Sequence, residues 1–226
     1  MERRVVSAGT PAAPTTFVPP PPVPFDALEH VLTAGSVLHR VHGSFPAGAF
    51  NPGMGGPTRF AHFTDAGDPS AGIVPVLYAA STAEAAVCET LLHDVPLQGG
   101  RLSRVKYHGR RETTLVLQRD VRLAKLMGAG LRRLSVAPQD LTATSGDVYA
   151  QTVLWAQAAH AAGFEGLAWM SARENTAEAY VLFGDRVAES ELQETSDGLG
   201  PFDRPGPGFR WLSAYCALVK VELLLS

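Results

Sequence analysis

The sequence lacks most of the features that assign a protein to a class at once. Two cysteines in 226 residues, Cys88 and Cys216, are too few for a disulfide framework or a four-thiolate metal site, so we expect a reduced, cytoplasmic protein. Nineteen basic residues against twenty-two acidic ones leave a net charge of −3, which gives no global field for nucleic acid. No apolar run reaches the roughly 18–20 residues that cross a bilayer, and no apolar stretch follows the basic start. We therefore expect neither a membrane span nor a secretory signal.

The common catalytic signatures are missing as well. The sequence has no P-loop and no G-x-S-x-G elbow, and the glycines around Met54 do not have the spacing of a dinucleotide fingerprint. His39, His42 and His62 alternate with apolar residues, but no carboxylate or cysteine completes a metal set, so no metal site is expected. Cys88 lies within an expected helix, where a small packing residue is favoured over a nucleophile.

Proline divides the chain into two parts. Seven of the seventeen prolines fall in residues 1–24, which predicts an extended or disordered arm, because proline fixes φ and donates no backbone hydrogen bond. An inert tail is favoured over a docking peptide. Residues 25–226 are long enough for one folded domain with a sizeable core, beginning near Phe25.

Hydrophobic patterning predicts many short strands and few helices. The capping-box spacing of Ser81 and Glu84 predicts a helix over residues 81–93, and an alanine-rich amphipathic run predicts another over 147–162, with Gly163 as its cap. Strands do not alternate regularly with helices, which favours an α+β fold with six to eight strands. Strands are expected at residues 36–41, 74–80, 102–107, 113–117, 166–170, 179–183 and 215–224, and a short helix at 28–32. Residues 59–63 alternate only weakly and could form a strand edge. The patterns at 120–127 and 131–134 are ambiguous and could form a strand and then a short helix.

Several polar side chains interrupt these apolar elements. Arg40 lies in the first strand, Tyr78 near the end of the strand before the first long helix, and Glu89 within that helix. Arg59 follows a loop rich in glycine and proline, and Ser171 and Arg173 follow an apolar strand. A charge inside an apolar element costs free energy unless it is paired or used. These residues therefore form either a functional site or a structural Arg–Glu bridge, or they lie on a solvent-exposed face.

Four blocks of sequence resemble the RES domain, a family named after an arginine, a glutamate and a serine. The blocks are LHRVHG (38–43), FNPGMGGPTRF (50–60), VPVLYAASTAEAAVCETLLHD (74–94) and GLAWMSARENTAEAYVLFGDR (166–186). Their order and spacing carry the resemblance. The family's functional positions fall on Arg40, Arg59, Tyr78, Glu89 and Ser171.

The resemblance implies an ADP-ribosyltransferase-like fold and an NAD+-degrading toxin of a type II toxin–antitoxin pair, blocked by an Xre-type antitoxin. It implies that Arg40, Glu89 and Ser171 are catalytic. Glu89 would stabilise a ribosyl cation, and Arg40 and Arg59 would hold the pyrophosphate. Tyr78 would stack on nicotinamide, Ser171 would contact ribose or phosphate, and either Arg173 or Arg59 would favour a phosphate acceptor. NAD+ is then the substrate, with inorganic phosphate as a possible co-substrate, and no metal or redox cofactor is required.

The sequence leaves several alternatives open. The nicotinamide–ribose bond could be cleaved by phosphorolysis or by hydrolysis, and the same site could transfer ADP-ribose to a protein. A third alternative is a catalytically silent module that binds a nucleotide or a partner protein. The oligomeric state is also open, including a homo-oligomer.

Overall fold

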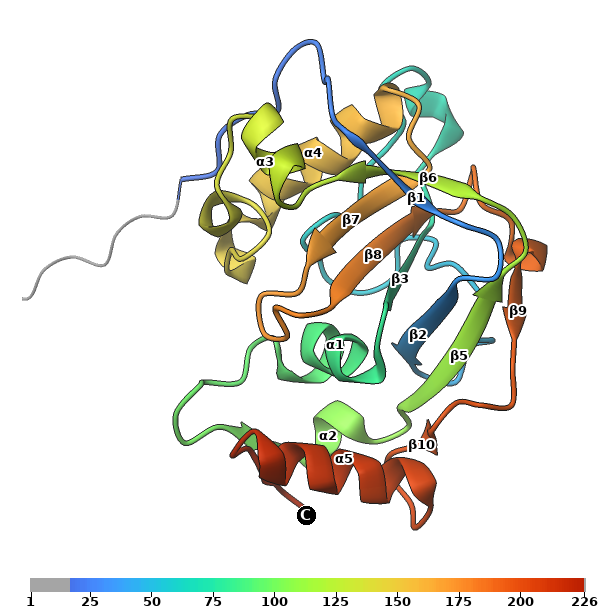
Figure 1. Ribbon diagram of the computed structural model, residues 1–226, viewed down its shortest axis with the longest axis vertical. Coiled ribbons are helices and arrows are strands. Elements are labelled where there is room, and N and C mark those ends of the chain that lie inside the picture. Colours follow the sequence, from blue (N-terminus) through green and yellow to red (C-terminus); the bar gives the residue numbers. More distant parts are fainter. Residues whose placement is uncertain (1–16, 226) are drawn as a thin grey trace, which may run out of the picture.

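The computed structural model describes residues 17–225, and one mixed sheet dominates it (Figure 1). Nine strands form this sheet in the order β1-β6-β7-β8-β3-β2-β5-β10, and β9 pairs with the same edge of β5 as β10, opposite β2. Strands β6 and β7 are parallel, and the other pairs in the sheet are antiparallel. The nine strands are β1 (Glu29–Leu32), β2 (Val37–His42), β3 (Val76–Ala80), β5 (Arg111–Leu117), β6 (Val121–Lys125), β7 (Gly166–Met170), β8 (Glu178–Phe183), β9 (Leu192–Glu194) and β10 (Gly200–Pro201).

Helices are few and mostly short. The two longest are α4 (Tyr149–Ala161) and α5 (Pro207–Leu218). A small parallel pair of strands, β4 (Arg101–Leu102) and β11 (Glu222–Leu223), lies apart from the main sheet. The remaining helices are α1 (Ala83–Val87), the π-helix η2 (Cys88–Leu92), α2 (Arg104–Tyr107), α3 (Ala129–Arg133) and the 3₁₀ turns η1 (Pro69–Ala71), η3 (Pro138–Asp140), η4 (Gly146–Val148) and η5 (Glu189–Glu191). In the described part of the chain, no helix is long and apolar enough to cross a membrane.

The residues of β7 and β8 explain why these strands lie at the centre of the sheet. Strands β7 and β8 are nearly continuous apolar runs, as expected of strands buried on both faces. At Gly166 an added Cβ would lie 2.1 Å from the carbonyl oxygen of Val181, so this close approach of β7 and β8 requires glycine. Helix α4 covers one face of these strands through Trp155, Ala156 and Ala159 (Figure 1).

Two further clusters complete the core. One is formed by the opposite face of the sheet, where side chains from β1, β2, β3 and β5 to β9 meet. The other joins α1 and η2 to α5, with Val87 and Leu91 packing near Leu212 and Cys216. Burying apolar area at roughly 25 cal/mol per Å² makes these clusters the main source of stability. The last cluster ties the C-terminal helix to the helix that carries Glu89.

The mixed sheet with few helices confirms the coarse fold expectation, and several element predictions are wrong. Residues 28–32 form strand β1 instead of a helix, because they pair with β6 in register Glu29 to Ala124. Residues 215–224, expected as a strand, contain the end of α5 and only the short strand β11. Of residues 102–107, only Leu102 is in a strand and 104–107 form α2, while 59–63 make an isolated bridge but no strand.

Two local details also differ from expectation. Thr82 rather than Ser81 caps helix α1, by accepting a hydrogen bond from the amide of Ala85 at 3.1 Å. The end of the proline-rich segment contacts the domain, since Val18 is buried and the indole of Trp155 donates to the carbonyl of Pro19 at 2.9 Å. The packed chain therefore begins before Phe25. Residues 1–16 of the predicted arm lie outside the described residues.

Candidate functional site

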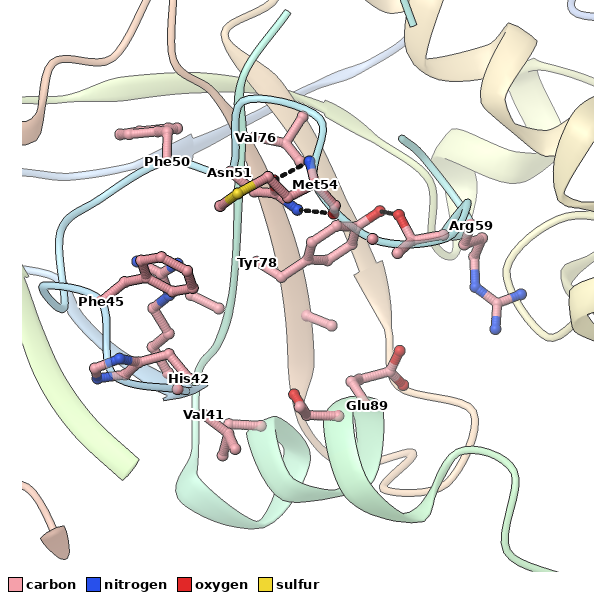
Figure 2. A pocket seen from close by; sticks show the side chains of 18 of the residues that line it. Val41, His42, Phe45, Phe50, Asn51, Met54, Arg59, Val76, Tyr78 and Glu89 are labelled. Carbon is pink, nitrogen blue, oxygen red and sulfur yellow. Dashed lines mark hydrogen bonds between the residues drawn. The ribbon is translucent and has the colours of Figure 1, made fainter. Parts of the chain in front are cut away.

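A cavity of about 740 Å³ opens between the sheet, the loop of residues 43–59 and the helix pair α1–η2. Its volume lies within the range typical of small-molecule sites. Side chains from β2, β3, β7 and β8 line it on the sheet side. Asn51 fixes the covering loop: its backbone pairs with Val76 at 2.7 and 3.0 Å, and its side-chain oxygen accepts from the amides of Gly53 and Met54 (Figure 2).

Arg40 and His42 occupy one end of this cavity. They are two residues apart on β2 and therefore point to the same face of the strand. Arg40 is 9% exposed and donates to the carbonyl of Ala47; burial lowers its pKa to about 10, with Glu189 acting in the opposite direction. Burial, followed by the charges of Arg40 and Arg111, lowers the pKa of His42 to about 4. The arginine is thus a costly buried cation, and the histidine beside it is neutral at pH 7.

Tyr78 forms part of the cavity wall, with its hydroxyl group tied to the covering loop. The hydroxyl lies 2.9 Å from Oγ1 of Thr58 and accepts from the amide of Phe60 at 3.0 Å (Figure 2). Burial raises the pKa of Tyr78 to about 12, so the phenol stays protonated. Its ring meets that of Trp169 edge to face, with centroids 6.2 Å apart. The hydroxyl is therefore structural, while the aromatic surface faces the cavity.

Glu89 enters the cavity from the opposite side, on the first turn of the π-helix η2 (Figure 2). Single turns of π-helix are rare and frequent at functional sites. The Oγ of Ser171 donates to Oε1 of Glu89 at 2.7 Å and itself accepts from the amide of Glu174 at 3.2 Å. Ser171 is 1% exposed. The serine therefore fixes one oxygen of the carboxylate and leaves the other oxygen toward the cavity.

Arg59 lines the cavity, and one nitrogen of its guanidinium is bound by a neighbouring segment. Nη1 donates to the carbonyl and hydroxyl of Thr144 at 2.9 and 2.8 Å. The guanidinium also lies over the ring of Tyr149, 5.5 Å from its centroid. Arg59 thus joins the covering loop to the segment before α4, and Tyr149, whose ring it contacts, also lines the cavity.

All six residues singled out from the sequence lie in the described part of the chain, and four of them line this cavity: Arg40, Arg59, Tyr78 and Glu89. Ser171 is not among the lining residues and reaches the site through Glu89. Arg173 lies outside the cavity and donates to the carbonyl of His93 at 2.9 Å. The structure therefore brings five of the six into one connected group.

Sequence reasoning missed other lining residues, notably His42, Arg110, Tyr149 and Trp169. A signal existed for His42, which alternates with Arg40 along one strand. Arg110 precedes β5 and its guanidinium lies near Gly43, but only the pairing of His42 with Arg111 in the sheet brings it there. No sequence pattern distinguishes Tyr149 or Trp169 from core aromatic residues.

Comparisons with known proteins identify the family of the chain and a similar fold. The sequence model of the RES domain matches residues 37–204. Among solved structures, a chain of the M. tuberculosis MbcT–MbcA toxin–antitoxin complex is similar, with a TM-score of 0.55 and 16% sequence identity over 84% of this chain and 92% of that chain. At this identity the likeness shows a shared fold. No curated protein is matched by sequence.

Proposed function

The chain belongs to the RES domain family, and from this premise we propose that it is the toxin of a toxin–antitoxin pair and degrades NAD+. The observation that carries the proposal is the convergence of a fixed carboxylate, a buried arginine and aromatic rings on one cavity. That combination suits a ligand with an anionic pyrophosphate, flat bases and a glycosidic bond that breaks to leave positive charge. An ADP-ribosyltransferase-like arrangement of the site is part of the same proposal.

Glu89 is the group we assign to the transition state. As the C–N bond to nicotinamide breaks, its electron pair neutralises the pyridinium nitrogen, and the ribose carbon becomes an oxocarbenium-like cation. A carboxylate held by Ser171 at 2.7 Å would stabilise that cation without reorganising. A phosphate oxygen then bonds to the ribose carbon to give ADP-ribose-1″-phosphate. If water attacks instead, ADP-ribose forms and a proton is released.

We assign substrate binding to the arginines that line the cavity away from Glu89. Arg40 donates to Ala47 through Nη1, which leaves other N–H groups of its fork for a phosphate. Arg59 likewise donates only through Nη1, to Thr144, so we assign the second cationic contact to its remaining N–H groups and a third to Arg110, an exposed arginine that lines the cavity near Gly43. The rings of Tyr78 and Tyr149 are the surfaces that would hold the nicotinamide.

The opening of the cavity suits a covering protein. Phe45 and Met54 line it and are 56% and 51% exposed. Large apolar side chains exposed at the rim of a site are a feature of protein interfaces. We therefore propose an Xre-type antitoxin as the partner that closes the site, with both proteins in the cytoplasm. The antitoxin should lower turnover when it is added to the purified chain.

The direct test incubates the purified full chain with NAD+, with and without inorganic phosphate, and resolves the products by mass. The proposal predicts that nicotinamide is released and that ADP-ribose-1″-phosphate is the second product when phosphate is present. This reaction should be faster than the formation of ADP-ribose when phosphate is left out. ADP-ribose at equal rates in both reactions would identify hydrolysis. Label from NAD+ on protein would identify a protein ADP-ribosyltransferase, and binding without turnover would identify a silent module.

A further inference from the structure

The C-terminal helix α5 contacts the support of Glu89, although residues 207–218 lie beyond the matched range 37–204. Tyr215 is the residue that makes this contact. It is 7% exposed, and its ring stacks on that of Trp211 with centroids 5.1 Å apart and planes at 17°. Its hydroxyl points toward two residues that flank the Glu89–Ser171 pair.

The first contact is to the chain neighbour of Glu89. The hydroxyl oxygen of Tyr215 lies 3.2 Å from Sγ of Cys88. Burial raises the pKa of the Cys88 thiol, so the sulfur keeps its proton. Because the tyrosine hydroxyl donates its own proton to Glu174, the thiol is the donor in this contact. Tyr215 therefore fixes the point at which the π-helix η2 begins.

The second contact is to the turn that carries Ser171. The Tyr215 hydroxyl donates to Oε2 of Glu174 at 3.3 Å, and the Thr176 hydroxyl donates to Oε1 at 2.6 Å. The amide of Glu174 donates in turn to Oγ of Ser171, which donates to Glu89. The hydroxyl groups of Tyr215 and Thr176 thus hold the side chain of Glu174, and the backbone amide of Glu174 orients Ser171.

Tyr215 therefore lies at a point where both supports of Glu89 meet. We propose that Tyr215 is a positioning residue for Glu89, holding η2 through Cys88 and the Ser171 turn through Glu174. The inference rests on the proposed function, in which Glu89 faces the ribosyl cation. It also gives α5 a role in the site that packing alone would not require.

The first test measures steady-state NAD+ turnover for the full chain, Tyr215→Phe and Tyr107→Phe. Tyr107 is a matched control, because it is 2% exposed and its hydroxyl donates to the carbonyl of Leu224 in the same C-terminal segment. Loss of the Tyr215 hydroxyl should lower kcat about tenfold with KM within twofold, as expected for a contact that acts in the transition state. Tyr107→Phe should leave both parameters within twofold.

A second variant separates positioning from folding. Glu174→Ala should also lower kcat, and the double variant with Tyr215→Phe should be no slower than the slower single variant, because both changes cut one chain of contacts. Effects of Tyr215→Phe and Glu174→Ala that simply multiply would contradict the inference. So would equal losses of activity in Tyr215→Phe and Tyr107→Phe.

The third readout does not depend on turnover. In protein labelled with ¹³C on glutamate side chains, the Glu89 carboxyl resonance is the one that disappears in Glu89→Gln. The inference predicts that this resonance shifts in Tyr215→Phe and stays in place in Tyr107→Phe. An unchanged resonance in Tyr215→Phe overturns it whatever the activity. A shifted resonance in a chain that never consumes NAD+ would refute the proposed function and retain the positioning role.

Discussion

Replacing Arg40 with methionine should stabilise the fold while removing NAD+ binding. Arg40 is 9% exposed, and burial lowers its pKa from 12.5 to about 10. A cation held in such a place costs folding free energy at every pH below 10, because the unfolded chain solvates the charge fully. Methionine has a similar length and no charge, so it fills the space of the stem without that cost.

The size of the effect follows from two opposing contributions. The lowered pKa of Arg40 corresponds to about 3 kcal/mol of penalty for keeping the charge. The substitution also leaves the carbonyl of Ala47 without its donor, which costs about 1 kcal/mol. The net gain is about 2 kcal/mol. For a chain of this size that corresponds to a rise in Tm of roughly 4–8 °C.

Differential scanning fluorimetry with and without ADP-ribose measures both effects at once. The wild-type chain should gain Tm when ADP-ribose is added, because a ligand that binds the folded state stabilises it. Arg40→Met should melt at a higher temperature without ligand and gain nothing from it. A lower Tm without ligand would show that the arginine is structural. An unchanged response to ADP-ribose would show that Arg40 does not contact the pyrophosphate.

Three further outcomes are expected. Arg110→Ala should raise KM for NAD+ about fivefold with kcat unchanged and with less effect at high salt, whereas the exposed Arg204→Ala should do neither. Ser171→Ala should lower kcat roughly ten- to hundredfold by releasing the Glu89 carboxylate, and unchanged kinetics would show that this hydrogen bond is incidental. His42 takes up a proton near pH 6.5 in the unfolded chain but only near pH 4 in the folded protein. The free energy of unfolding should therefore fall by up to about 3 kcal/mol as the pH is lowered from 6.5 to 4. In urea melts, His42→Gln should show a weaker fall, and an equal fall in both proteins would refute the assignment.

The sequence predicted best those strands and helices whose own residues carry a strong signal. Residues 166–170 and the first helical residues after Thr82 carry strong apolar or capping signals, and the structure has strand β7 and helix α1 there. The errors occur where partners far along the chain decide. Residues 28–32 form β1 because an edge of β6 is available to them. In residues 207–218, Leu212, Tyr215 and Cys216 follow the helical i, i+3, i+4 spacing, a signal that the strand prediction overlooked.

In the candidate site too, local patterns could be predicted from the sequence and contacts between distant residues could not. Motif residues such as Arg40 and Glu89 could be picked out because charges inside apolar elements are costly. Their convergence on one cavity could not, because it depends on how β2 and η2 pack around the same loop. Nor could the sequence show that Thr144 engages Arg59 while Arg110 lines the cavity near Gly43. Contacts between residues far apart in the chain decide which cations line the cavity and what orients each of them.

The most direct measurement compares nicotinamide release by the wild-type chain, Glu89→Gln and Glu194→Gln at saturating NAD+. Glu194 is an exposed glutamate on β9 and serves as the matched control. Our account predicts a loss of at least about a hundredfold in kcat for Glu89→Gln, affinity for ADP-ribose within a few fold of wild type, and normal activity for Glu194→Gln. Equal rates of nicotinamide release by all three proteins would contradict the assignment of Glu89 to the transition state.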